Sequence, residues 1–288
     1  MNVEKAENYA KRFNRVLDYI EQHVAEPLSL EQLCQVAHFS KFHFHRQFAD
    51  YLGIPVARYI LLLRLKQASY RLVFEPRSKV IDVALDAGFE NPESFARAFR
   101  HVFGTSPSGF RKKPDWEAWH GAFRFRLPKR NQPVSVEIVD FPATRIGVKE
   151  HWGPVAQLNY AVGQFIEWRK TSGLSPKESC RTFGIAYENP ETVEPARFHF
   201  EVGGEVHGAI PPNPQGVVGK LIPGGRCAKV RHFGSHDRIG DSIYPLYRDW
   251  LPGSGAELRD FPLFFHYLNL IPETPEGELI TDIYLPLV

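Results

Sequence analysis

Residues 78–110 read SKVIDVALDAGFENPESFARAFRHVFGTSPSGF, and this stretch decides the fold of the first half of the chain. Ser78 is suited to cap a short helix whose apolar side is formed by Val80, Val83 and Ala84. A turn at Gly88 leads to a second helix, which we expect to be capped by Asn91 and to end at Gly104. The stretch therefore predicts two helices joined by a short turn.

The same plan occurs upstream in residues 28–59, LSLEQLCQVAHFSKFHFHRQFADYLGIPVARY. Ser29 and Gln32 have the spacing of a capping box at the start of a short helix. After a turn, Ser40 is placed to cap a second helix that ends at Gly53. The first half thus predicts two helix-turn-helix units of one kind.

The second helix of each unit carries an FxRxF motif, FHRQF at 44–48 and FARAF at 95–99, 51 residues apart. At 100° per residue the two phenylalanines of each motif share one face and are predicted core, whereas Arg46 and Arg97 point the opposite way. The outward stripes are Phe42, His45, Arg46 and Ala49 in the first unit and Glu93, Ala96, Arg97 and Arg100 in the second. Arginine and small or apolar side chains suit reading of the major groove, because Arg bridges guanine O6 and N7. Solvated helix faces are the alternative, which two matched copies disfavour.

Residues 55–74 separate the units and contain no Gly or Pro beyond Pro55, so they predict one long helix. Twenty residues would span about 30 Å, close to the roughly 34 Å of one DNA turn. Residues 1–130 hold 21 Lys and Arg against 14 Asp and Glu, whereas residues 131–288 hold 14 against 19. A basic half beside an acidic half is typical of a nucleic-acid binder with a second module.

The second half also contains an internal repeat. The stretch IGVKEHWGPVAQLNYAVGQFIEWRKTSG at 146–173 is similar to AKVRHFGSHDRIGDSIYPLYRDWLPGSG at 228–255, with an offset of 81 residues at His151 and His232. Each copy predicts a strand followed by an amphipathic helix. Further strands are predicted at 182–187, 196–202, 262–270 and 280–287. This half therefore predicts a pseudo-twofold α+β domain with an antiparallel sheet and a central cleft.

The first half of the chain resembles a known family. ENPESFARAFRHVFGTSPSGFR at 90–111 resembles the second helix-turn-helix signature of AraC/XylS transcription regulators, and LSLEQLCQVAHFSKFHFHRQF at 28–48 resembles the first. The resemblance covers about residues 8–113 and implies a double helix-turn-helix that binds an asymmetric DNA site. It carries DNA contacts over to Phe42, His45 and Arg46 in the first unit and to Asn91, Glu93, Ser94 and Arg97 in the second. We add Ser40, Lys41, Ala96 and Arg100, which belong to the same two helices.

Residues 134–288 resemble GyrI-like effector-binding domains, on the stretches FGIAYENPETVEPARF, GGRCAKVRHFGSHDRIGDSIYPLYRDWL and ELITDIYLPL. The resemblance implies a cleft that binds hydrophobic small molecules between aromatic side chains. The candidate ligand residues are Trp152, Tyr187, Glu201, Phe233, Phe265, Tyr267 and Tyr284. Phe265 matches a position where many relatives carry a glutamate, so we expect an apolar pocket that prefers neutral aromatic ligands. Glu201 or Glu137 would supply a charge if its strand turned that side chain inward.

Several kinds of chemistry find no motif in the chain. GxSxG, HExxH and P-loop motifs are absent, and three scattered cysteines offer neither a disulfide framework nor zinc spacing. His43 and His45 are two residues apart and face different sides of a helix, so we predict no metal and no cofactor. The start of the chain lacks the apolar region of a signal peptide, and no run is long enough to span a membrane, so a cytoplasmic location is expected.

Together these observations predict a one-component transcription regulator rather than an enzyme. We expect a double helix-turn-helix domain at 1–115, a linker at 116–132 and an effector-binding domain at 133–288. Its expected partners are a double-stranded DNA operator, RNA polymerase and a small hydrophobic ligand, and no membrane. Two alternatives are kept: a small-molecule hydrolase fused to a DNA-binding domain, and a regulator whose C-terminal domain binds a protein partner.

Overall fold

The computed structural model describes residues 3–123, 125, 127–128, 130 and 133–288, apart from the side chains of residues 3–9 and 42. The chain divides into two compact units. Unit 1 contains residues 1–132 together with two segments from later in the chain, Gly234–Asp241 and Ile271–Leu279. Unit 2 contains Pro133–Phe233, Ser242–Leu270 and Ile280–Val288.

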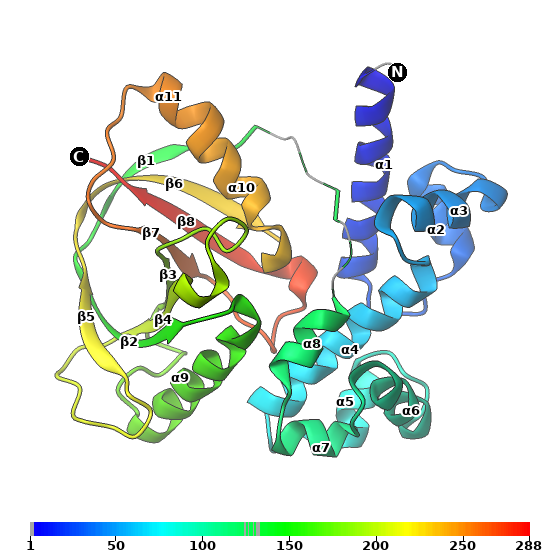
Figure 1. Cartoon of the computed structure of the whole chain (residues 1–288), viewed down its shortest axis with the longest axis horizontal. Coiled ribbons are helices and arrows are strands. Elements are labelled where there is room, and N and C mark those ends of the chain that lie inside the picture. Colours follow the sequence, from blue (N-terminus) through cyan, green and yellow to red (C-terminus); the bar gives the residue numbers. More distant parts are fainter. Residues whose placement is uncertain (1–2, 124, 126, 129, 131–132) are drawn as a thin grey trace. The chain divides into compact units, whose positions relative to one another are not determined.

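Eight helices lie between residues 3 and 122 of unit 1 (Figure 1). Their bounds are α1 Val3–Gln22, α2 Leu30–Ala37, α3 Lys41–Leu52, α4 Val56–Phe74, α5 Val80–Asp86, α6 Pro92–Phe103, α7 Pro107–Lys112 and α8 Trp116–Ala122. The pairs α2–α3 and α5–α6 are the two predicted helix-turn-helix units. The predicted long helix between them is also confirmed, with Pro55 as its N-cap.

The helix ends test the predicted caps directly. Ser29 and Gln32 form the predicted capping box of α2, and the Asn91 side chain accepts a hydrogen bond from the Ser94 amide at the start of α6. The prediction for Ser78 was wrong, because Lys79 is the N-cap of α5 and the Ser78 hydroxyl donates to Glu75 instead. Ser40 has the N-cap position of α3, but its side chain makes no capping hydrogen bond.

Phenylalanines of the FxRxF motifs fill the cores of both helix pairs. Phe44 and Phe48 are completely buried with side chains of α1, α2 and α4. In the second pair, the Phe99 ring centroid lies 5.5 Å from that of Phe95, 4.7 Å from that of Phe103 and 5.5 Å from that of Phe110. Both pairs are thus held by aromatic packing on the face opposite Arg46 and Arg97.

The expectation of a linker beginning at residue 116 needs correction. Residues 116–122 form α8, in which Trp116 is 1% and Trp119 5% exposed. Trp116 packs against Phe74 and Phe110, at ring-centroid distances of 5.8 Å and 5.4 Å. Burial of these two tryptophans stabilises a helix where the change from helical to strand-like sequence predicted only a connection.

Unit 1 also contains a buried ion pair network centred on α4. Lys66 is 3% exposed, and its Nζ lies 2.7 Å from Asp237 Oδ2 and 2.8 Å from Glu276 Oε1. Burial alone would lower the pKa of Lys66, but these two carboxylates outweigh it and hold the pKa well above its usual value. The segments Gly234–Asp241 and Ile271–Leu279 therefore supply the charges that this buried lysine requires.

Unit 2 is built on one eight-stranded antiparallel sheet in the order β1-β6-β8-β7-β3-β4-β2-β5, which curls strongly (Figure 1). Its strands are β1 Glu137–Phe141, β2 Thr144–Trp152, β3 Thr182–Ala186, β4 His199–Glu205, β5 Val218–Ile222, β6 Gly225–Phe233, β7 Leu263–Tyr267 and β8 Ile280–Pro286. The predicted strand at 196–202 begins three residues later, because Pro195–Arg197 forms a 3-10 turn. The helices of the unit are α9 Leu158–Ser172, α10 Gly240–Pro245, which begins in unit 1, η4 Leu246–Trp250 and α11 Leu251–Ser254.

The strand order shows the twofold pattern that the internal sequence repeat predicted. Reading inward from either edge gives β5-β2-β4-β3 and β1-β6-β8-β7, so the two halves match strand for strand. At the centre Gly184 of β3 is paired with Phe265 of β7, and these residues are themselves 81 positions apart. Each residue of β1, β2, β3 or β4 therefore has its equivalent 81 positions later, in β5, β6, β7 or β8 respectively.

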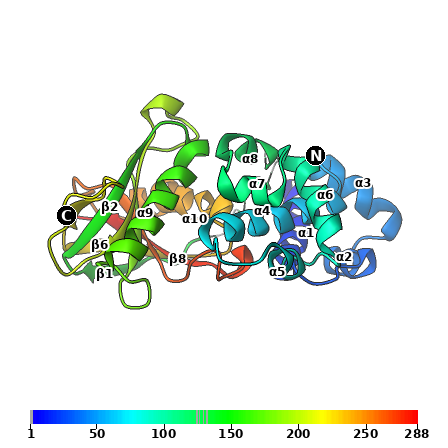
Figure 2. The ribbon, with the colours of Figure 1, turned by 90° about the horizontal axis from the view of Figure 1, so that it is seen from below.

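The two faces of the sheet have different roles. Phe165 and Trp168 of α9 pack on Val202, and Leu246 of η4 packs with Val230, which places the helices on one face. Figure 2 shows α9 beside β2. The opposite, concave face carries an apolar cluster formed by Phe141, Ile146, Val148, Phe183, Ile185, Ile222, Cys227, Phe264 and Tyr284. Side chains beyond this cluster on the concave face are the ones available to a ligand.

Candidate DNA-reading surface and ligand site

The predicted DNA contacts of the first helix pair lie at the surface of α3. Ser40, Lys41, His45 and Arg46 are exposed, whereas the side chain of Phe42 lies outside those that the structure describes. The Arg46 side chain is 86% exposed, and its Nε lies 3.8 Å from Asp50 Oδ2. Such an exposed pair contributes little to stability, so Arg46 is free to exchange it for a base or a phosphate.

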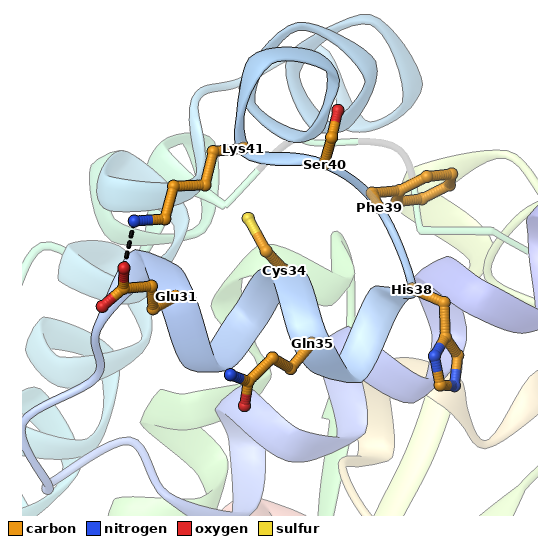
Figure 3. Close-up of a pocket in the computed structure, with 7 residues that line it drawn as sticks. All are labelled: Glu31, Cys34, Gln35, His38, Phe39, Ser40 and Lys41. Atoms are coloured by element: carbon orange, nitrogen blue, oxygen red, sulfur yellow. Dashed lines mark hydrogen bonds and ion pairs between the residues drawn. The ribbon is translucent and has the colours of Figure 1, made fainter.

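A shallow hollow of about 660 Å³ lies between α2 and the start of α3. It is lined by Glu31, Cys34, Gln35, His38, Phe39, Ser40 and Lys41. Figure 3 shows the Lys41 side chain directed at the Glu31 carboxylate, an ion pair whose two side chains are 55% and 66% exposed. The hollow therefore lies beside the exposed end of α3. Lys41 is held there only by an ion pair that solvent weakens.

In the second helix pair the predicted contacts divide into two groups. Glu93, Arg97 and Arg100 are exposed on α6, and within the described part of the chain neither arginine forms a salt bridge. Ser94 and Ala96 are half-buried. The Asn91 side-chain oxygen is occupied by the Ser94 amide at 2.8 Å, so in this structure it serves as the helix cap.

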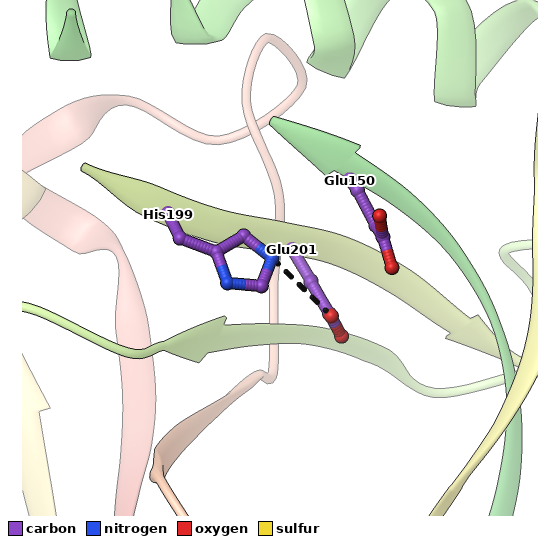
Figure 4. Close-up of side chains that lie close together, drawn as sticks. All are labelled: Glu150, His199 and Glu201. Carbon is purple, nitrogen blue, oxygen red and sulfur yellow. Dashed lines mark ion pairs between the residues drawn. The ribbon is translucent and has the colours of Figure 1, made fainter. Parts of the chain in front are cut away.

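The concave face of unit 2 gathers six side chains that we call the Glu201 cluster: Glu150, Trp152, Tyr187, His199, Glu201 and Lys220. Antiparallel pairing brings them together, because Glu150 is the register partner of Glu201 and Trp152 that of His199. His199 and Glu201 alternate with Phe200 along β4 and so point to the same face. Figure 4 shows His199 and Glu201 on one strand and Glu150 on its neighbour.

Glu201 is the charged centre of this cluster. It is completely buried, and its Oε1 accepts a hydrogen bond from the Tyr187 hydroxyl at 3.0 Å and contacts Lys220 Nζ. Its Oε2 has no hydrogen-bond partner. A buried carboxylate oxygen without a partner is costly, so a ligand that donates a hydrogen bond to this atom would be favoured.

The neighbouring groups respond to burial and to this charge. Burial raises the pKa of Tyr187 to about 12, and the Glu201 carboxylate adds to the rise. Burial would lower the pKa of Lys220, but its hydrogen bonds to Glu150 and Glu201 outweigh that effect and raise it. The hydrogen bond from Lys220 lowers the pKa of Glu150. Tyr187 is therefore neutral, and Lys220 and Glu150 are charged, at physiological pH.

Three rings stack above Glu201. The His199 ring lies between Trp152 and Tyr187, with centroid distances of 3.8 Å and 4.0 Å and interplanar angles of 9° and 17°. Burial lowers the pKa of His199, so the ring is neutral at pH 7 although Glu201 acts in the opposite direction. Trp152 remains 61% exposed and Tyr187 39% exposed. Flat aromatic surface is thus available to solvent directly beside a buried carboxylate.

The other candidate ligand residues are not part of this cluster. Phe265 and Tyr267 lie on the helix-covered face, where Phe265 stacks on Phe200 with ring centroids 6.2 Å apart. Tyr284 belongs to the apolar cluster of the concave face, and Phe233 is 62% exposed at the end of β6. Phe265 and Glu201 therefore lie on opposite faces of the sheet.

Three residues of the Glu201 cluster were not predicted from the sequence: Glu150, His199 and Lys220. Lys220 joins the cluster because the edge strand β5 pairs with β2, which no local pattern reveals. Glu150, His199 and Glu201 offer donor atoms within 4.8 Å of one another and are the residues that would hold a metal ion, although the sequence predicted none. Because Lys220 already contacts both carboxylates, a metal would have to displace it.

Comparison with known proteins adds the family to this geometry. Residues 135–288 match the model of the GyrI-like small molecule binding domain. The chain belongs to this family. Residues 33–113 match a helix-turn-helix domain, so the GyrI-like domain follows a DNA-binding region of AraC type.

Curated relatives cover both parts. The probable transcriptional regulator YgiV of Escherichia coli K12 is 41% identical over 157 residues, which are 54% of this chain and 98% of YgiV. The right origin-binding protein of E. coli K12 is 34% identical over 115 residues, 40% of this chain and 38% of that protein. YgiV is therefore similar to about half of this chain over nearly the whole of its own length.

Solved structures also resemble the separate parts. The C-terminal domain of EcmrR has 17% identity and a TM-score of 0.46, covering 54% of this chain and 98% of that domain. The DNA-binding domain of AdpA in complex with a target DNA has 28% identity and a TM-score of 0.32, covering 34% of this chain and 86% of that domain. The two family matches and the curated relatives, by contrast, show that the chain is a DNA-binding transcription regulator with a GyrI-like domain. Within the residues described, no helix has the length and apolarity to cross a membrane.

Proposed function

We propose that the GyrI-like domain senses a small aromatic molecule at the Glu201 cluster and that this molecule controls DNA binding. The observation that carries the proposal is the aromatic stack over a buried carboxylate that keeps one oxygen without a partner. A flat ring stacked on Trp152 would bury exposed apolar surface, and a donor group on the ring would satisfy Glu201 Oε2. Ring and donor together define the ligand class.

On the DNA side, we propose that α3 and α6 of one chain enter successive major grooves. The linking helix α4 has 19 residues, which gives about 28 Å, near the spacing of one DNA turn. The exposed Arg46, Arg97 and Arg100 would then contact bases or phosphates. We also propose that the DNA-bound protein contacts RNA polymerase and acts in the cytoplasm, as expected of a one-component regulator.

Ligand and DNA need not touch to influence one another. If the ligand binds the DNA-competent form of the chain with a different affinity from the other forms, binding of either partner shifts binding of the other by the same factor. The proposal therefore requires a measurable change in operator affinity at saturating ligand.

Replacing Trp152 by alanine should weaken binding of an aromatic ligand to the full chain by about tenfold, because stacking on an aromatic face contributes about 0.5 to 1.5 kcal/mol beyond the buried area. Calorimetric titration measures the affinity. The matched control is Phe233→Ala, since Phe233 is the equivalent of Trp152 in the other half and is 62% exposed. Equal losses in both variants would contradict the assignment of the ligand to the Glu201 cluster.

We propose binding without turnover at this site. Tyr187, with a pKa of about 12, is a weak acid at neutral pH, and Glu201 Oε1 is occupied by Tyr187 and Lys220. Incubation of the full chain with reactive esters and strained small rings should release no product above that of Glu201→Gln. Turnover that Glu201→Gln removes would favour the hydrolase instead.

A further inference from the structure

Lys220 is part of the proposed ligand site, on which the inference below rests. Lys220 Nζ contacts Glu201 and lies 2.5 Å from Glu150 Oε1. The lysine side chain is 33% exposed, so one side of its ammonium group faces solvent while the other faces the buried carboxylate. It therefore occupies the place at Glu201 Oε1 that a cationic ligand would seek.

The other half of the sheet shows how the same position is treated there. Asp282 is the equivalent of Glu201, and it is held by two hydrogen bonds from Arg231, at 2.7 Å and 2.9 Å. Arg231 is the equivalent of Glu150, and Val139 is the equivalent of Lys220. Each half thus neutralises its buried carboxylate with a cation of its own. Arg231 comes from β6, the strand next to Asp282, whereas Lys220 comes from β5, one strand beyond the neighbour of Glu201 on the equivalent side.

The two neutralised carboxylates differ in the hydrogen-bonding capacity that is left for a ligand. The Asp282 side chain is 5% exposed and both of its oxygens are paired with Arg231. In the Glu201 cluster, Glu201 Oε2 and His199 Nε2 have no hydrogen-bond partner, and aromatic surface adjoins them. A ligand therefore finds hydrogen-bond capacity at Glu201 but not an uncompensated buried charge.

We propose that Lys220 is the residue that determines charge specificity, so that the Glu201 cluster accepts neutral aromatic ligands with a donor group and disfavours cationic ones. A cationic ring must push the ammonium group of Lys220 away from Glu201 before it can use that carboxylate. The displaced lysine keeps only the pairing with Glu150, whose side chain is 40% exposed and whose attraction water weakens. Loss of the better-buried pair offsets what the new cation gains.

The test uses two probes of the same size and shape, each with one hydroxyl donor: 4-(hydroxymethyl)-1-methylquinolinium as the cation and 1-(hydroxymethyl)-4-methylnaphthalene as its neutral counterpart. In the unsubstituted full chain, the neutral probe should bind at least as tightly as the cation. Lys220→Met should tighten binding of the cation by about tenfold or more and change binding of the neutral probe less than threefold. Lys220→Gln keeps a hydrogen-bond donor for Glu201 and should give the same selectivity with less risk to folding.

The control is Lys149→Met, which removes the same charge from β2, where Lys149 Nζ donates to the Gln215 carbonyl at 2.8 Å on the other face. It should leave both affinities unchanged. The proposal is overturned if the unsubstituted chain prefers the cation by tenfold, or if folded Lys220→Gln shows no gain in selectivity. If neither probe binds, or if Trp152→Ala weakens the binding of neither probe, the proposed ligand site is contradicted. The proposed role of Lys220 is then contradicted as well.

Discussion

Replacing Arg46 and Arg97 together by alanine should weaken binding to the preferred operator by about 2 to 6 kcal/mol. Each arginine that bridges a guanine contributes about 1 to 3 kcal/mol of discrimination. The two side chains lie on different helices, α3 and α6, so their effects should add. The operator is first selected from random duplexes with the full chain, and affinity is then compared on that duplex and on a scrambled one.

The control removes the same charge elsewhere, with Arg145→Ala and Arg248→Ala, both exposed residues of unit 2. That variant should bind the operator as the unsubstituted chain does. The losses caused by Arg46→Ala and Arg97→Ala should be larger on the operator than on the scrambled duplex. Equal losses on both would show that these arginines only contact phosphates.

Phe99→Ala should lower the free energy of unfolding of the helical region by about 3 to 5 kcal/mol. Phe99 is completely buried and its ring contacts Phe95, Phe103 and Phe110, so its loss leaves a cavity at the base of α6. Operator binding should weaken with it, because α6 would no longer be held in a single position. Thermal unfolding and operator titration of the full chain measure the two effects.

Ligand binding provides an internal comparison in the same variant. The affinity of 1-(hydroxymethyl)-4-methylnaphthalene for Phe99→Ala should stay close to its affinity for the unsubstituted chain, because the Glu201 cluster belongs to unit 2. Leu85→Ala is the matched control, since Leu85 on α5 is 49% exposed and its loss should cost less than about 0.5 kcal/mol. A similar loss of stability in both variants would contradict the aromatic core as the main support of α6.

The helical region could be predicted well because its signals are local. Helix caps such as Ser29 and Asn91, and the spacing of Phe95 and Phe99, act within one or two turns of helix. The prediction was wrong where two local signals competed, as at Ser78, which bonds to Glu75 rather than to its own helix. The helix α8 was missed because its burial depends on Tyr70 and Phe74, more than 40 residues away in sequence.

The candidate ligand site was harder to predict because strand pairing assembles it. The sequence suggested Glu201 only on condition that its side chain faced inward, and alternation in one strand does not say which set of residues is inside. The register with β2 supplies that answer, since it places Glu150 opposite Glu201 and Trp152 opposite His199. The same parity moves Phe265 and Tyr267 to the helix-covered face.

The pairing of Gly184 with Phe265 at the centre of the sheet bears on how two similar halves can share one chain. Identical halves would set the same residue against itself on the symmetry axis. A side chain at 184 would place its Cβ 2.4 Å from the Tyr267 hydroxyl and 2.7 Å from the Phe200 ring, so two large residues would collide there. Two glycines would leave the space of the Phe265 ring unfilled. A single polypeptide avoids both problems because its two halves can differ in sequence. The same freedom lets one half keep a fully paired Asp282 while the other keeps exposed aromatic rings beside Glu201.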